Sequence, residues 1–293
     1  MYSKHKEKLL HMILHETLFS EADLKCELQA LLNDSNAWQQ VDQNKLMQSM
    51  LVHIGSVDSE LRDGLIYGCF YTMIVEQDLL HPALLNDTLQ YCVTDLLDKG
   101  IGENQSDSVF TRTFTMLLVA LILAKDNESD FIEANKIEEL THKLIAYLLA
   151  EKDVRGYVPD NGWAHSVAHV SDAVDELVKS PKFNKASFLD ILRPLWQMML
   201  QTNYAFIHDE DERLLVPIFT MLEQGLQEQE IITLLSETTE MLSAQKAQLD
   251  VWHYRILRFN WKSFLKSFYI QTANSPQYVA LHQSIADCLK VDK

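Results

Sequence analysis

The feature that most constrains the fold is a hydrophobic repeat with a period of about 3.6 residues, which continues through almost the whole chain. It is clearest in segments 61–66, 89–96 and 140–148. Apolar side chains at this spacing share one face of a helix, whereas the strict alternation of a strand is hard to find. The 293 residues include 8 Gly and 6 Pro, fewer than the turns of sheet proteins usually need. We therefore predict an all-α protein.

The breaks between the apolar segments indicate how the helices are connected. They fall at 98–107, 155–162, 179–183 and 207–212, and their lengths suit connections between helices rather than linkers between domains. The sequence therefore predicts one helical domain over 1–293. Residues 1–50 would form N-terminal helices or a cap, 51–222 a core, and 223–293 C-terminal helices or a cap.

Four predicted helix starts recur at similar intervals. A basic or imidazole side chain follows each start, namely Arg62, Arg112, His165 and Arg213, at spacings of 50, 53 and 48 residues. Between successive starts there is room for one further helix. This pattern predicts a curved α-α solenoid of HEAT/armadillo-like helix pairs with degenerate repeats of roughly 50 residues. The alternative is that such spacing arises by chance in any helical protein.

Charge and cysteine content limit the partners and the compartment. The chain has 25 Lys+Arg against 42 Asp+Glu, a formal net charge of −17, which repels nucleic-acid phosphates and anionic lipids. The longest apolar run, 116–124, is too short to span a bilayer, and the N-terminus does not resemble a signal peptide. Four cysteines without a CxxC pair are typical of a reducing compartment. We expect a cytoplasmic protein.

The most distinctive segment is 154–177, VRGYVPDNGWAHSVAHVSDAVDEL. A helix capped by residue 160 or 161 would place His165, His169 and Asp172 on one face, with Glu176 a turn further on. Two histidines and a carboxylate can hold a divalent metal ion that keeps water as fourth ligand. One hypothesis is therefore a metal-dependent hydrolase with His165, His169 and Asp172 as ligands. A zinc-peptidase motif is disfavoured, because Ser166 stands where HExxH has its general base.

This segment, together with SVFTRTFTMLLVALIL, LRDGLIY and DEDERLL, resembles the bacterial domain-of-unknown-function 2785 family. The likeness extends from about Leu51 to Leu222. The resemblance implies an all-helical, bacterial, cytoplasmic protein whose family motif contains Trp163, His165, His169 and Asp172. It implies no substrate and no activity.

The preferred functional hypothesis is a binding scaffold with a groove around His165 and His169. Its ligand would be a peptide, a partner protein or a small anionic molecule, because guanidinium groups bind carboxylates and phosphates well. The groove candidates are Trp163, His165, His169, Asp172, Arg62, Arg112, Arg155 and Arg213. Two alternatives stay open. The arginines could form ion pairs between stacked helices, and the histidine stripe could serve packing alone.

Two further segments have charged or aromatic character. Residues 208–213, HDEDER, lack the ligand spacing of a calcium loop and are predicted to begin a helix. Residues 251–270 are basic and aromatic. We expect Trp252, Ile256, Phe259 and Phe264 to close the end of the stack, although such helices can also dock on membranes or partner proteins.

Overall fold

The computed structural model describes residues 18–34 and 37–291, so the helical pattern expected before residue 18 lies outside the described part. Helices form most of it, and the strands in it are two residues long, which confirms the all-α prediction. In chain order the elements are α2 (Glu21–Asn33), η1 (Ala37–Gln39), α3 (Gln43–His53), η2 (Glu60–Tyr67), α4 (Gly68–Tyr71), η3 (Thr72–Glu76), α5 (Pro82–Tyr91), η4 (Cys92–Leu96), α6 (Ser108–Ser129) and α7 (Ala134–Ala150). They continue with β1 (Tyr157–Val158), β2 (Gly162–Trp163), α8 (Ser166–Lys179), η5 (Lys185–Ser187), α9 (Phe188–Met198), α10 (Glu210–Glu223), α11 (Glu228–Gln245), α12 (Val251–Thr272), η6 (Pro276–Tyr278) and α13 (Val279–Val291).

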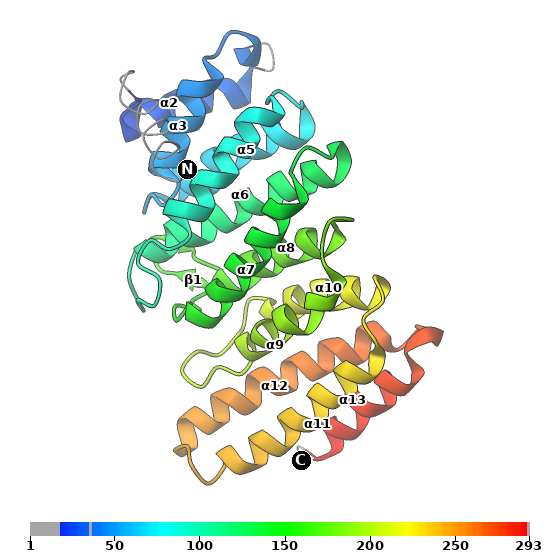
Figure 1. Ribbon diagram of the computed structural model, residues 1–293. Helices are drawn as coiled ribbons and strands as arrows, with labels where there is room; N and C mark the ends of the chain where they lie inside the picture. The colour runs from blue at the N-terminus through cyan, green and yellow to red at the C-terminus, as the bar shows by residue number, and fades with distance from the viewer. Residues whose placement is uncertain (1–17, 35–36, 292–293) are drawn as a thin grey trace.

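The helices pack in an elongated stack with α2 at one end and α13 at the other (Figure 1). Helix α8 packs between α6 and α10, and α10 in turn packs against α12. The intervening helices form a second row, in which α7 packs on α9 and α11 on α13. Trp196 of α9 joins this row to α11 by donating its indole N–H to Thr238 at 2.9 Å. Alternate helices along the chain are therefore neighbours in space.

Helix α6 is the central helix of the fold. Among the described residues it is the one helix long and apolar enough to cross a membrane, but 83% of its apolar window is buried inside the protein. Residues 109–123 are all buried, because η2, η3 and α5 cover one side of the helix and α8 covers the other. The apolar side chains of α6 therefore pack in the protein core.

A small hairpin precedes α8 and changes the way this helix begins. Strands β1 and β2 pair antiparallel, and Asp160 (φ 68°) and Gly162 (φ 78°) adopt the left-handed conformation that the tight turn requires. The expectation that residue 160 or 161 would cap the helix is therefore wrong. The N-cap is His165, itself left-handed with φ 49°, and α8 begins at Ser166. The predicted helix start in HDEDER is confirmed, because α10 begins at Glu210.

Candidate metal centre

Arg62 lies beneath the hairpin and fixes it to the helical stack. Its guanidinium is fully buried and donates to the backbone carbonyls of Asn161 at 2.6 Å and Trp163 at 3.1 Å. It also stacks over the ring of Phe110, 4.1 Å from the ring centroid. Burial lowers the pKa of Arg62 to about 10. Its hydrogen bonds therefore fix the backbone at Asn161 and Trp163, just before His165.

Two other arginines that the sequence placed in the predicted groove pair with carboxylates of the segment that follows α7. Arg112 is fully buried and makes a two-pronged pair with Glu151, at 2.7 Å and 2.9 Å. Arg155 pairs with the buried carboxylate of Asp153 at 2.7 Å, and its side chain is 20% exposed. These contacts hold the chain between α7 and the hairpin, so both guanidinium groups are engaged with carboxylates of the protein itself.

His169 also faces the protein interior. The residue is 7% exposed, and its Nδ1–H donates to the carbonyl of Thr113 in α6 at 3.2 Å. Its ring makes an edge contact with Phe114 at 5.3 Å. Burial, together with nearby positive charge, holds the pKa of His169 well below its ordinary value of 6.5. His169 is thus a neutral imidazole that joins α8 to α6.

Asp172 pairs with Arg213 across the α8–α10 contact. The Arg213 Nε donates to Oδ1 at 3.1 Å and its Nη2 donates to Oδ2, which is the two-pronged geometry favoured by this pair. Burial raises the pKa of Asp172 even though the hydrogen bonds from Arg213 act to lower it. The side chains are 29% and 40% exposed, so this pair reaches the surface.

A different trio offers ligand atoms to a common point. His165, His208 and Glu210 each contribute one nitrogen or carboxylate oxygen, and these atoms lie within 4.8 Å of one another. Among the described residues, it is the only group of three or more His, Cys, Asp or Glu side chains whose ligand atoms lie close enough to share a metal ion. The three expected ligands do not form such a group, because left-handed His165 lies before α8 and its ring meets residues at the start of α10.

The trio contains three buried polar atoms without a hydrogen-bond partner. They are Nε2 of His165, Nδ1 of His208 and Oε1 of Glu210. The other carboxylate oxygen of Glu210 is satisfied, because it accepts from the backbone N–H of His208 at 2.8 Å. An unpaired buried polar atom costs about 1–3 kcal/mol and is rare in folded proteins. Three such atoms side by side are what a bound cation would satisfy.

The electrostatics of the trio also suit a metal. Burial, with a contribution from His208, lowers the pKa of His165 to about 4, so this imidazole is neutral and has a free lone pair at neutral pH. Burial raises the pKa of Glu210, whose residue is 1% exposed, so an uncompensated carboxylate is disfavoured here. A divalent cation would stabilise its ionised form.

Gly156 and Trp163 shape the space around the trio. A Cβ atom at position 156 would lie 2.5 Å from Nδ1 of His208 and 2.8 Å from Oε1 of Glu210, so only glycine leaves this space open. The indole of Trp163 makes edge contacts with His165 at 4.3 Å and with His208 at 5.1 Å. The side chain of His208 is 23% exposed, which gives the trio a route to solvent.

The donor set fits a zinc-like ion. Two imidazoles and one carboxylate are a common set for Zn²⁺, and three protein ligands leave a fourth position for water or substrate. Hard ions such as Ca²⁺ prefer oxygen ligands alone. Sequence reasoning missed His208 and Glu210 because they are distant in sequence from the histidine stripe. A signal was available, since His165 and His208 stand one and two residues before the starts of α8 and α10.

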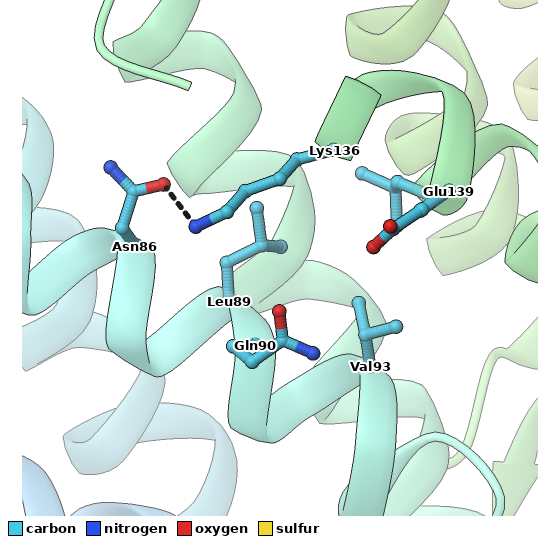
Figure 2. A pocket seen from close by; sticks show the side chains of 7 residues that line it. Asn86, Leu89, Gln90, Val93, Lys136 and Glu139 are labelled. Atoms are coloured by element: carbon cyan, nitrogen blue, oxygen red, sulfur yellow. Dashed lines mark hydrogen bonds between the residues drawn. The ribbon is translucent and has the colours of Figure 1, made fainter. Parts of the chain in front are cut away.

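The pocket in Figure 2 is a separate feature between α5 and α7. It is lined by Asn86, Leu89, Gln90, Val93, Lys136, Glu139 and Leu140. Lys136 donates to the side-chain oxygen of Asn86 at 3.3 Å. The lining contains no histidine or cysteine and no pair of carboxylates, so it offers neither a metal ligand set nor a nucleophile with a base.

Comparison with known proteins gives a family and no activity. Residues 97–270 match the model of the family described as "Protein of unknown function (DUF2785)". The match covers α6 to nearly the end of α12 and includes all three residues of the trio. No curated protein and no solved structure matches the chain.

Proposed function

The chain belongs to the DUF2785 family, which has no assigned activity, and from its site we propose a metal-dependent hydrolase. In this proposal His165, His208 and Glu210 hold one zinc-like divalent ion. The observation that carries it is the convergence of three buried, unpaired ligand atoms on one point. In this proposal His208 and Glu210 take the place of His169 and Asp172 in the ligand set expected from the sequence, and His165 is the one residue common to both sets.

The residues of the chain have distinct roles in this proposal. His165 and His208 supply nitrogen donors, and Glu210 supplies the negative charge that balances the ion. Gly156 leaves room for the ion, and Trp163 shields it on one side. When bound, such an ion lowers the pKa of coordinated water and makes it a nucleophile near neutral pH. The partly exposed His208 marks the side from which water and substrate would arrive.

Arg213 is proposed to orient an anionic group of the substrate. Its side chain is 40% exposed, and Asp172 holds its Nε and Nη2, which leaves Nη1 for a carboxylate or phosphate. Its charge is near enough to contribute to the lowered pKa of both His165 and His169. This places a fixed positive charge beside the proposed centre.

A second candidate is a binding scaffold without catalysis, which takes a peptide, a partner protein or a small anionic ligand. The partial exposure of Asp172 and Arg213 favours it, because an ion pair that reaches the surface beside the trio can exchange partners with a ligand. In that case the metal would fix the starts of α8 and α10 and would not react.

We also propose that the two helical rows form a HEAT-like solenoid of helix pairs about 50 residues long in a bacterial cytoplasmic protein. The repeat is supported by the contacts between alternate helices, namely α6 with α8, α8 with α10, α10 with α12, α7 with α9 and α11 with α13. Four free cysteines, Cys26, Cys69, Cys92 and Cys288, support a reducing compartment.

The test uses full-length protein purified without a histidine tag. Metal content is measured, and hydrolysis of carboxylic ester, phosphoester and peptide substrates is compared for zinc-loaded and chelator-treated protein. The hydrolase proposal expects activity that disappears with chelator, returns with zinc and is absent in Glu210→Gln. Stoichiometric metal without hydrolysis of any substrate class would favour the scaffold. Absence of metal from protein that is folded and zinc-exposed would overturn both metal roles.

A further inference from the structure

Helix α12 has the opposite charge to the rest of the chain. Its 22 residues contain Arg255, Arg258, Lys262 and Lys266 and no Asp or Glu, while the whole chain has a formal charge of −17. One side of the helix packs into the stack, where Ile256, Trp261 and Phe264 are buried against neighbours that include α10 and α13. Ile256 and Phe264 therefore close the core as expected from the sequence.

The other side of α12 is exposed and has a regular composition. Its stripe consists of Trp252, Arg255, Phe259, Lys262, Lys266 and Tyr269, separated alternately by three and four residues. This spacing places all six on one helix face. Trp252 is 68% exposed, Phe259 46% and Tyr269 38%. The expectation that Trp252 and Phe259 would be buried in a cap is therefore wrong, because both side chains are exposed. Tyr269, at the end of the stripe, stacks on the ring of His282 in α13, with 4.1 Å between the ring centroids.

The cations of this stripe lack partners within the described part of the chain. Arg255, Lys262 and Lys266 form no ion pair there, although acidic residues outnumber basic ones in the sequence. Large aromatic side chains exposed beside them lose the free energy that burial would give. A face with unpaired charge and exposed aromatic surface is typical of a binding surface.

We propose that the exposed face of α12 binds an acidic amphipathic helical segment of a partner protein. The alternating spacing of three and four is the one by which two helices pack side by side. Aromatic positions would contact apolar side chains of the partner, and the three cations, spread over about 16 Å of helix, would pair with its carboxylates. This proposal is independent of the metal site.

The observations favour such a segment over a membrane or a nucleic acid. A flat anionic membrane would bring a large part of a chain with a formal net charge of −17 close to anionic lipids and be repelled by it, whereas a narrow helix contacts the stripe alone. A nucleic acid carries one charge per nucleotide, and the net negative charge of the protein would repel the phosphates that extend beyond the stripe. The strongly exposed Val251 and Ile270 at the two ends of the helix suit aliphatic partners.

The probe is a fluorescent, designed helical peptide with Glu and Leu at alternating spacings of three and four residues. We expect saturable binding to the full-length protein that weakens with salt. The double variant Lys262→Glu/Lys266→Glu should bind roughly 10-fold more weakly or worse, and Phe259→Ser should also lose affinity. The control is Lys152→Glu/Lys246→Glu, which changes the charge equally at exposed positions outside the stripe and should bind as the wild type does.

Four outcomes would overturn the proposal. They are no peptide binding by folded wild-type protein, an equal loss in the control variant, tighter binding to phosphatidylglycerol-containing vesicles or oligo-dT than to the peptide, and self-association of the protein through this face. Circular dichroism and thermal unfolding of each variant establish that the helices are intact.

Discussion

Nδ1 of His208 lies 3.7 Å from Oε1 of Glu210, and both atoms are buried without a hydrogen-bond partner. This separation is too long for a hydrogen bond, yet it suits two ligands that share a metal ion. The two residues stand at the beginning of α10, and His165 stands at the beginning of α8, the helix beside it. The centre thus depends on two neighbouring helix starts and on the hairpin that turns His165 toward them.

The first prediction concerns the space that Gly156 leaves open. Gly156→Ala changes no ligand, but its Cβ would lie 2.5 Å from Nδ1 of His208. We expect zinc affinity to fall by more than the roughly 10- to 100-fold typical of changes around a metal site, because a ligand must move. Isothermal titration with zinc measures this effect.

The matched control is Gly64→Ala, since a Cβ at position 64 meets nothing within 4 Å. Its zinc affinity should equal that of the wild type, and its stability should stay equal or rise slightly because alanine favours helix. Equal zinc affinity in Gly156→Ala and Gly64→Ala would contradict the proposal that Gly156 leaves the space in which the ion binds.

The second prediction concerns Arg62, which holds the hairpin. Arg62→Leu leaves the carbonyls of Asn161 and Trp163 without their buried donor. We expect the free energy of unfolding to fall by about 3 kcal/mol or more, measured in urea, and zinc affinity to fall with it. The control Arg193→Leu breaks an exposed pair with Glu237 and should cost about 1 kcal/mol or less. A similar loss of unfolding free energy in the two variants would contradict the role of Arg62 in holding the hairpin.

The third prediction is the pH dependence of stability in metal-free protein. His169 has a folded-state pKa well below 6.5, so below that pH the unfolded state binds more protons than the folded state. Stability should therefore be complete above pH 6.5 and fall as the pH decreases below it, by up to about 1.4 kcal/mol per pH unit for this group. The free energy of unfolding is measured between roughly pH 4.5 and 8, a range that includes the ordinary histidine pKa of about 6.5.

His169→Gln should fall less steeply over the same range, because it lacks the group that protonates on unfolding. The exposed His142 on α7 provides the control, and His142→Gln should keep the wild-type slope. A slope in His169→Gln as steep as in the wild type would mean that the buried imidazole does not determine the acid sensitivity.

The sequence predicted the helices well because their apolar periodicity directly reflects burial. Helix α6 is an example, since its continuous apolar run lies between neighbours on both sides. The hairpin was missed because its strands have two residues each, too few to show any period. The turn chemistry of Asp160 and Gly162 was present in the sequence, but it was interpreted as a helix cap.

The candidate site was predicted in part. His165 was identified, yet its assumed helical geometry placed it with His169 and Asp172, which instead contact Thr113 and Arg213. A left-handed φ at a histidine cannot be inferred from periodicity, and it redirected the ring toward α10. Residues at the starts of two neighbouring helices meet only through the tertiary packing, so the pairing with α10 required the structure.

The most direct test of the central claim is zinc titration of untagged wild type, Glu210→Gln and Asp172→Asn, followed by calorimetry. Both substitutions remove one carboxylate charge and preserve side-chain shape, so they separate the two possible ligand sets. We predict one zinc per wild-type chain, near-wild-type affinity in Asp172→Asn and loss of binding in Glu210→Gln. Retained binding in Glu210→Gln, with loss in Asp172→Asn, would contradict a centre built from His165, His208 and Glu210.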